Sequence, residues 1–317
     1  MIAKNGFQRS ALVGLVSTAL MVCHLAAANA AAKPKLALVQ INQEALFFTQ
    51  MDAGAQAAAK AAGVELSIYN ANNDPNAQAN AIETYIQQKV SAILVDAIDV
   101  NGIKPAIAEA KKAGIPVITI DAIVSGDNAV QIGVDNQQVG ATIGKFTADY
   151  VKKSLGGKAQ VGVVGALNSY IQNVRTDGFK AGLASAPGAK IMATVDGQNV
   201  QDQAQTASES LITAHPDMQI VYATGEPALI GVVAASMAQG GTMPFKVVGW
   251  DLSSQAIQGI DSGLVLAVVQ QDAMGEGKAA VQAAMKLIAH QAVPKNISVP
   301  VTIVTKANVD PFRADFK

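Results

Sequence analysis

Strand-like and helix-like stretches alternate along most of the chain, and this alternation restricts its fold more than any other feature. Leu36–Ile41 is an apolar run of strand length, and apolar residues then recur at helical spacing until Gly63, a residue type that commonly ends helices. The same order repeats through the strand-like stretches Val64–Tyr69 and Ala92–Val95. Strands that alternate with helices form parallel sheets covered on both faces, so the sequence predicts an α/β fold.

The alternation returns in the second half of the chain, which predicts two similar lobes. Gln160–Gly165 begins this second series of strands and helices. Gly54 and Gly178 occupy comparable places in the two series, as do Asn73 and Asn199. A chain of 317 residues also has the length of two ordinary domains.

The end of the chain holds a helix-like stretch, Gly277–His290, and an extended stretch, Ile297–Thr305. Together they are too short for a third domain. We therefore expect these elements to be exchanged between the two lobes, which requires several crossings of the chain and a hinge.

The first thirty residues have the pattern of an export signal. Lys4 and Arg9 precede the apolar run Ser10–Leu25, and Ala28-Asn29-Ala30 supplies small residues for a cleavage site. We expect export to the periplasm and cleavage near Ala30. An uncleaved membrane anchor is the alternative.

The charge balance of the chain and the motifs missing from its sequence argue against several classes of protein. Lys and Arg together number 23 against 24 Asp and Glu, so no basic field favours nucleic acid. The sequence has no nucleophile elbow, no zinc-protease motif and no phosphate-binding loop. Cys23, the only cysteine, lies inside the export segment and leaves the mature chain without a thiol. We expect no catalytic residue, no metal site, no cofactor and no nucleic-acid partner.

Two adjacent aromatic residues, Phe47 and Phe48, follow the first predicted strand in a chain that is only 4% aromatic. They lie where a strand gives way to a helix, and open α/β sheets bind their ligands at this edge. Flat rings beside polar residues suit the apolar face and hydroxyl rim of a sugar-like molecule. The alternative is ordinary packing in the core.

Polar side chains end several other predicted strands. Asp121 follows Ile115–Ile120, Asp251 follows a strand that ends at Trp250, and Gln271 ends Leu264–Gln271. Carboxylates accept hydrogen bonds from vicinal hydroxyls, and an amide both donates and accepts. Arg175, expected at the start of a helix, adds a fork of donors. Each alone is more often a cap, a turn residue or a surface ion pair, but together they predict a site for a neutral polyhydroxylated ligand.

The same residues bring out a family resemblance. From about Lys35 to its C-terminus the chain resembles the ribose-binding-like branch of the type I periplasmic sugar-binding proteins, which serve ABC importers. The segments that support the resemblance are Ala37-Leu38-Val39, Phe47-Phe48, Ile115–Asp121, Arg175-x-x-Gly178-Phe179, Thr213-Ala214-His215-Pro216, Val247–Asp251 and Gln271.

The resemblance implies two Rossmann-like lobes with parallel sheets, joined by a three-crossing hinge. A signal peptide would occupy residues 1–30. The N-terminal lobe would comprise residues 31–134 plus 272–301, and the C-terminal lobe residues 135–271 plus 302–317. The crossings would fall near 134–135, 271–272 and 301–302.

The resemblance also implies the ligand contacts. In relatives that bind ribose, the aromatic pair packs on the sugar, and the aspartates, the arginine and the glutamine bind its hydroxyls. Four positions depart from that site: Ala45 replaces Asn, Ala122 replaces Arg, Asn199 replaces a second stacking Phe, and Gly225 replaces Asn. With Asn42 and Glu226 added as nearby polar residues that compensate for the lost partners, the expected ligand-binding residues are Asn42, Phe47, Phe48, Asp121, Arg175, Asn199, Glu226, Asp251 and Gln271.

These departures predict a neutral ligand other than ribose, because ribose hydroxyls would be buried without partners. Another pentose, a hexose or a sugar alcohol is expected. The family further implies a monomer that closes about its hinge and delivers its ligand to an ABC permease in the inner membrane. Whether a chemoreceptor is a further partner stays open.

Two other functions remain as alternatives. The effector-binding domain of a lac-repressor-type regulator shares this fold, but an export signal occupies the place of its DNA-binding helices. A periplasmic enzyme acting on sugars would need a nucleophile or metal set, and none is recognisable in the sequence.

Overall fold

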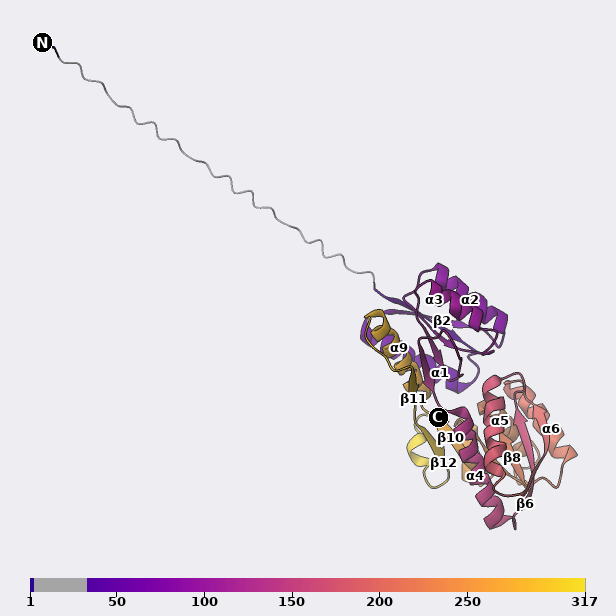
Figure 1. Cartoon of the computed structure of the whole chain (residues 1–317). Helices are drawn as coiled ribbons and strands as arrows, with labels where there is room; N and C mark the ends of the chain where they lie inside the picture. The colour runs from indigo at the N-terminus through magenta and orange to yellow at the C-terminus, as the bar shows by residue number, and fades with distance from the viewer. Residues whose placement is uncertain (3–32, 317) are drawn as a thin grey trace. The chain divides into compact units, whose positions relative to one another are not determined.

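The computed structural model describes residues 1–2 and 33–316, and two six-stranded sheets form its framework (Figure 1). The predicted signal peptide therefore falls outside the described residues, apart from the first two. Among the described residues, no helix combines the length and the hydropathy that a membrane span requires.

The first sheet is entirely parallel, with strand order β11-β5-β4-β3-β1-β2. Four helices cover its two faces, and we call the sheet with these helices the N-terminal lobe. Its elements are β1 (Lys35–Gln40), α1 (Leu46–Ala62), β2 (Glu65–Asn70), α2 (Pro75–Gln87), β3 (Ala92–Asp96), α3 (Lys104–Lys112), β4 (Val117–Ile120), β5 (Val130–Gly133), α9 (Ala273–Ile288) and β11 (Asn296–Ser298).

The second sheet has the equivalent order β12-β10-β9-β8-β6-β7, and only its edge pair β10–β12 is antiparallel. This sheet with its five helices is the C-terminal lobe. Its elements are α4 (Asn136–Ser154), β6 (Lys158–Gly165), α5 (Tyr170–Leu183), β7 (Gly188–Asp196), α6 (Gln201–Ala214), β8 (Ile220–Ala223), α7 (Glu226–Ala238), β9 (Lys246–Trp250), α8 (Ser254–Ser262), β10 (Val265–Gln271) and β12 (Val301–Val304), followed by a 3-10 turn at Asp310–Phe312.

Alternation of side chains along the strands explains why both faces of each sheet are buried. In β1, Leu36 and Leu38 belong to the core shared with α1 and α9, whereas Ala37 and Val39 pack with the residues of α2 and α3. Successive side chains of a strand point to opposite faces, so a continuous apolar run supplies both cores. The predicted α/β class with two similar lobes is confirmed.

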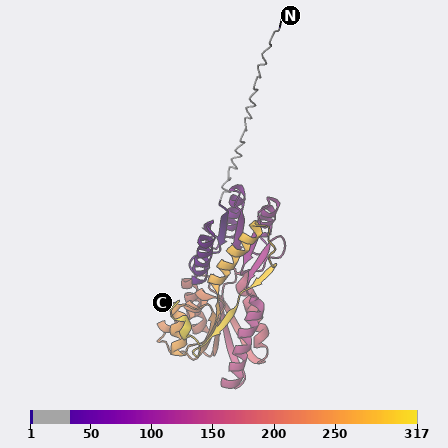
Figure 2. The same ribbon diagram turned by 90° about the vertical axis from the view of Figure 1, so that its left-hand side faces the viewer.

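The chain passes between the two sheets three times: from β5 to α4, from β10 to α9, and from β11 to β12. Figures 1 and 2 show the consequence for α9, drawn in orange, which lies beside the indigo and purple elements of the N-terminal lobe. The extended stretch Ile297–Thr305 likewise divides into β11 of one sheet and β12 of the other. The exact residue boundaries of the lobes stay a prediction.

Two glycines at equivalent places let helices pack closely. A Cβ added at Gly54 in α1 would lie 2.1 Å from the carbonyl oxygen of Met274 in α9. A Cβ at Gly178 in α5 would lie 2.1 Å from the carbonyl oxygen of Gln137 in α4. Gly54 and Gly178, which the sequence places at comparable positions, therefore have the same role: each lets two helices of its lobe approach closely.

One expected helix start is wrong. The sequence placed Arg175 at the beginning of a helix, but α5 begins at Tyr170, where Ser169 is the N-cap and its side chain accepts a hydrogen bond from the Gln172 amide. Arg175 therefore lies in the second turn. The N-cap serine supplies an acceptor for an amide that the helix leaves unpaired, which explains the earlier start.

We predict that Gly54→Ala lowers the free energy of unfolding by about 1–3 kcal/mol, because the added methyl group collides with backbone atoms rather than a movable side chain. Chemical denaturation monitored by circular dichroism measures this change. Ala57→Ser, at an exposed position of the same helix, is the control and should stay within about 0.5 kcal/mol. Equal stability of the two variants would contradict the close packing of α1 on α9.

Candidate ligand-binding site

A cavity lies between the two lobes, at the carboxyl ends of strands from both sheets. Seven of the nine residues expected from the sequence line it: Phe47, Phe48, Asp121, Arg175, Asn199, Glu226 and Asp251. The other lining residues are Ile41, Ala45, Asn73, Ile98, Asn168, Ser169, Ile171, Gln172, Gly225 and Pro227.

Asp121 and Asp251 hold equivalent positions, directly after β4 and β9. Both have left-handed backbone conformations, with φ values of 54° and 61°. The amide of Asp121 donates to the carbonyl of Ile132 at 2.8 Å, and that of Asp251 donates to Val269 at 2.7 Å. Left-handed backbone is uncommon outside glycine and concentrates at functional sites. In each lobe, the residue with this uncommon conformation is the one whose carboxylate lines the cavity.

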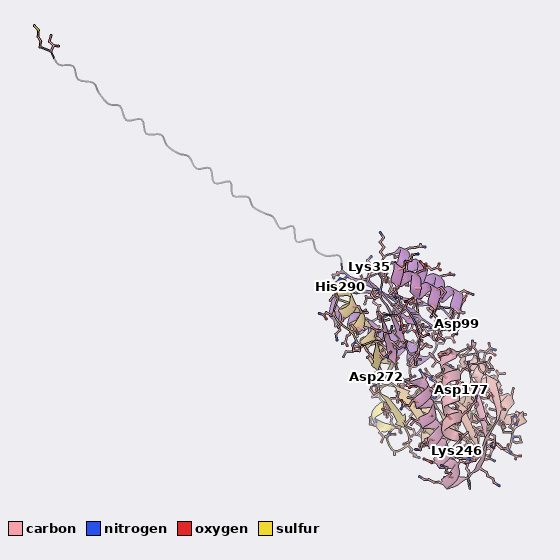
Figure 3. All side chains as sticks on the ribbon, in the orientation of Figure 1. Lys35, Asp99, Asp177, Lys246, Asp272 and His290 are labelled. Carbon is pink, nitrogen blue, oxygen red and sulfur yellow. The ribbon has the colours of Figure 1, made fainter. Side chains whose placement is uncertain are left out.

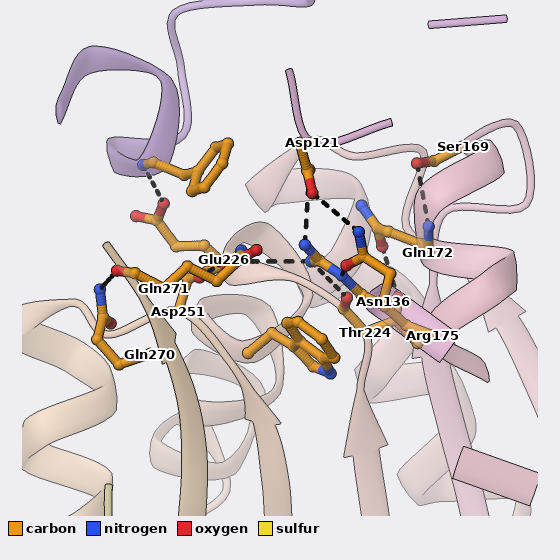
Figure 4. A network of polar contacts seen from close by, with 12 residues as sticks. Asp121, Asn136, Ser169, Gln172, Arg175, Thr224, Glu226, Asp251, Gln270 and Gln271 are labelled. Carbon is orange, nitrogen blue, oxygen red and sulfur yellow. Dashed lines mark hydrogen bonds and ion pairs between the residues drawn. The ribbon is translucent and has the colours of Figure 1, made fainter. Parts of the chain in front are cut away.

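The guanidinium of Arg175 lies between these two carboxylates (Figure 4). Its Nη2 is 3.7 Å from Asp121 Oδ2 and its Nη1 is 3.7 Å from Asp251 Oδ2. The ring of Trp250 lies beneath it, with the guanidinium carbon 3.9 Å from the ring centroid. Since Arg175 is only 4% exposed, water screens these interactions weakly.

Asn136, at the start of α4, connects the arginine to the first aspartate. Its side-chain oxygen accepts a hydrogen bond from Arg175 Nε at 2.7 Å, and its Nδ2 donates to Asp121 Oδ1 at 2.9 Å. No chemical motif in the sequence includes Asn136. The only signal was its place next to the expected crossing at 134–135, so its role was missed.

Phe47 and Phe48 lie in the first turn of α1, with ring centroids 5.4 Å apart and an interplanar angle of 81°. Each is 7% exposed and belongs to the core cluster of the N-terminal lobe. Both also line the cavity. Both roles expected for this pair therefore apply: the rings pack in the core and also form part of the cavity wall.

Glu226, from the C-terminal lobe, forms a hydrogen bond with the N-terminus of α1 in the N-terminal lobe. Its Oε2 accepts a hydrogen bond from the Phe47 amide at 3.2 Å, although the two residues lie 179 positions apart. The N-cap residue of α1, Ala45, has no side chain that could accept this bond. A carboxyl oxygen at a helix N-terminus satisfies an amide that the helix leaves unpaired. Glu226, in the first turn of α7, thus supplies the cap that α1 lacks.

Burial raises the pKa of two cavity carboxyls. The pKa of Glu226 rises to about 8, mainly through desolvation and further through the charge of Asp251, against the opposing hydrogen bond from Phe47. The pKa of Asp251 rises to about 6 through desolvation, although the Arg175 charge and the Gln271 amide oppose the shift.

Two further carboxyls, Asp96 and Glu276, are completely buried near the cavity aspartates. Neither oxygen of either group has a hydrogen-bond partner among the described residues. Desolvation raises the pKa of both well above its ordinary value, and the neighbouring carboxylate of Asp121 adds to the shift. An unpaired buried charge is very costly, and this cost disfavours the ionised form of both groups. Within the part of the chain that is described, no three His, Cys, Asp or Glu residues form a group suited to a metal ion.

Two expected residues do not line the cavity. Gln271 ends β10, and its Nε2 donates to Asp251 Oδ1 at 3.0 Å, so it supports a lining carboxylate. Asn42 donates to Asn73 Oδ1 at 3.1 Å, and its own Oδ1 accepts from the amides of Glu44 and Ala45. Asn42 therefore shapes the loop before α1.

His215 and His290, the histidines among the described residues, do not line this cavity. His215 follows the end of α6. His290 is exposed beyond the end of α9, among the polar side chains of the surface (Figure 3).

Residues 36–292 match the periplasmic binding protein domain family, and the chain belongs to this family. Among curated proteins, it is 29% identical over 261 residues to the ribose import binding protein of Bacillus subtilis, covering 82% of this chain and 83% of that one. It is 27% identical to the xylitol-binding protein of Mycolicibacterium smegmatis, covering 95% of this chain and 85% of that one.

The fold also matches that of a solved structure from the same class of proteins. The fold matches that of an ABC transporter periplasmic solute-binding protein from Actinobacillus succinogenes with bound D-allose, with a TM-score of 0.79 and 26% sequence identity. The match covers 88% of this chain and all of the other. The predicted fold and the predicted family are therefore confirmed.

The raised pKa of Glu226 predicts that the arrangement in which the lobes are in contact loses stability as pH rises from about 4.5 to about 8. Across this window the folded state keeps a proton that the unfolded state releases, and each such group contributes a slope of up to about 1.4 kcal/mol per pH unit. Glu226→Gln should reduce the fall in melting temperature between pH 6 and pH 8, measured by scanning calorimetry. Glu83→Gln, at an exposed carboxyl of α2, is the matched control. An unchanged slope for Glu226→Gln would contradict the pKa shift.

Proposed function

We propose that this chain is an exported solute-binding protein that captures a pentose, a hexose or a sugar alcohol in the cavity between its lobes. The observation that most supports this proposal is the meeting of Asp121, Arg175 and Asp251 in one cavity, with a guanidinium flanked by two carboxylates. Family membership supports export, a role in ABC transport and delivery of the ligand to a permease. The relatives named above include proteins described as binding ribose, xylitol and D-allose.

The cavity offers complementary chemistry to a polyhydroxylated molecule. The carboxylates of Asp121 and Asp251 accept hydrogen bonds from hydroxyls, and Arg175 donates to hydroxyl or ring oxygens. The rings of Phe47 and Phe48 offer an apolar surface to C–H groups. We assign ligand contact to these five side chains, and to Asn199 and Glu226 beside them.

A ligand other than ribose remains our proposal. Ala45, Asn199 and Gly225 all line the cavity, so three of the four positions that depart from the ribose site are in a position to alter selectivity. Ala122 is buried and is not among the lining residues. Small side chains at Ala45 and Gly225 give the ligand more room and fewer amide partners.

We propose that ligand capture closes the lobes about the three crossings. Two contacts between the lobes support this mechanism: the ion pair of Arg175 with Asp121, and the hydrogen bond from the Phe47 amide to Glu226. A ligand that bridges the same groups would favour the closed arrangement. The lobe boundaries at 134–135, 271–272 and 301–302 are part of this proposal.

Other parts of the proposal rest on the family alone. The family consists of binding proteins, and we propose that the ligand leaves unchanged, without turnover. The monomeric state and a chemoreceptor as second partner stay predictions. Chemical conversion of a bound sugar would instead support the alternative that the protein is an enzyme acting on sugars.

The ligand class predicts the outcome of a thermal-shift panel with D-ribose, D-arabinose, D-allose, xylitol, myo-inositol and amino acids. We expect a pentose, hexose or polyol other than ribose to raise the melting temperature most, because binding to the folded state alone stabilises it. A shift with ribose alone would overturn the departure from ribose, and a shift with amino acids alone would overturn the ligand class.

The proposed site predicts that Asp121→Asn weakens binding of the panel compound with the largest shift by on the order of 10–100-fold, because a charged acceptor is lost. Isothermal titration calorimetry measures this change. Asp177→Asn removes an exposed carboxylate from α5, the helix that holds Arg175, and should leave the affinity unchanged. Equal affinities for the two variants would place the binding site elsewhere.

Hinge closure predicts that small-angle X-ray scattering finds a smaller radius of gyration when this compound is present at saturating concentration. The reason is that the ligand stabilises the arrangement in which both lobes contact it. A radius unchanged at saturation would contradict closure while leaving the ligand class intact.

A further inference from the structure

Gln172 lies in the cavity wall although its place in the sequence predicts another role. Ser169-Tyr170-Ile171-Gln172 matches the capping-box pattern, in which the glutamine side chain turns back to the amide of the N-cap residue. In the structure the Ser169 amide donates instead to the Ala166 carbonyl at 3.0 Å. The Gln172 side chain is thereby free to point into the cavity, where the residue is 7% exposed (Figure 4).

Both ends of the Gln172 amide are engaged by residues of the C-terminal lobe. The hydroxyl of Thr224 donates to Gln172 Oε1 at 2.5 Å. Gln172 Nε2 donates to Asn199 Oδ1 at 2.7 Å. In this arrangement the Gln172 oxygen faces the hydroxyl and its nitrogen faces the oxygen of Asn199. Because Asn199 Oδ1 faces Gln172, the Nδ2 group of Asn199, a residue that lines the cavity, is left to donate elsewhere.

The position of Gln172 depends on the glycine at 225. A Cβ added to Gly225 would lie 3.1 Å from Gln172 Nε2 and 3.2 Å from its Cδ, which is tighter than ordinary packing. Any side chain at this position would push against the amide. The ribose site has larger side chains at positions 199 and 225. Here Asn199 bonds to the Gln172 amide, and Gly225 leaves free the space beside that amide which a side chain would occupy.

We propose that Gln172 determines the ligand specificity of the C-terminal side of the cavity. It does so as a positioning residue that turns Asn199 into a hydrogen-bond donor, and its own second Nε2 hydrogen adds to the same side. The cavity then offers acceptors at Asp121 and Asp251, and donors at Asn199 and Gln172. A bound sugar or polyol must place an oxygen that accepts hydrogen bonds at this donor side. This inference rests on the proposed function.

The test compares Gln172→Glu with Gln172→Met by isothermal titration calorimetry, using D-arabinose, D-allose, xylitol and myo-inositol. Glutamate keeps the shape and the bond from Thr224 but presents an acceptor to Asn199, whose amide must then rotate and turn its oxygen to the cavity. We expect the affinity for the probe that binds wild type most tightly to fall on the order of 10–100-fold, and the order of the probes to change. Methionine keeps the volume without fixing Asn199, and we expect a smaller loss of affinity.

Gln203→Glu adds the same charge at an exposed position of α6 and is the control. Its affinities should equal those of wild type. Thr224→Val removes the hydroxyl that bonds to Gln172 and should weaken the same probe, so it tests the inference even where Gln172→Glu folds poorly. Melting temperatures without ligand report whether each variant is folded.

A double-mutant cycle decides whether Gln172 acts through Asn199. If it does, Gln172→Met in the Asn199→Ala background causes little further loss, so the two effects are not additive. Additive losses would overturn the positioning role. Unchanged affinities and unchanged probe order in Gln172→Glu, Gln172→Met and Thr224→Val would overturn the inference as a whole. A wild-type protein that binds none of the four probes would instead count against the proposed function.

Discussion

The guanidinium of Arg175 is the charge on which the cavity depends. It is buried and lies 3.7 Å from a carboxylate of each lobe, so it connects Asp121 and Asp251 across the boundary between the lobes. Five carboxyl groups surround this one cation or lie buried near it: Asp96, Asp121, Glu226, Asp251 and Glu276. Desolvation and the charges of neighbouring carboxylates raise the pKa of Asp96, Glu226, Asp251 and Glu276, and the charge of Arg175 opposes this shift in Asp96, Asp251 and Glu276.

Duplication of the lobe explains how two carboxylates come to face one cavity. Each sheet has the same strand order, and each places an aspartate in a left-handed conformation after the strand at the same position. The remaining groups break this symmetry. The aromatic pair belongs to the N-terminal lobe, whereas Arg175 and Gln172 belong to α5 of the C-terminal lobe. A ligand therefore meets an apolar wall supplied by one lobe and polar donors supplied by the other, and the full set exists only where both lobes contribute.

Local patterns predicted the fold and part of the cavity wall, because both depend on features that short stretches of sequence contain. Apolar runs and strand-ending polar residues located Asp121 and Asp251, and the edge of a parallel sheet brings such residues together. Asn136 and Gln172 were missed since their roles arise only from contacts between distant elements. Glu226 was expected near the ligand, but its bond to the amide of Phe47, 179 residues away, has no signature in either segment.

Gln172 shows why ligand selectivity does not follow from comparing single positions with those of relatives. Asn199 and Gly225 depart from the ribose site, and each departure taken alone predicts an empty space and a lost partner. In the folded chain the two are coupled, because the Gln172 amide donates to Asn199 and lies against the glycine. The lost amide and ring are thus replaced by an amide from a third position, which brings a donor to a different point of the wall. Ligand selectivity in such a cavity follows from the network of side chains that fills it, and a single aligned residue defines it only when its neighbours are also unchanged.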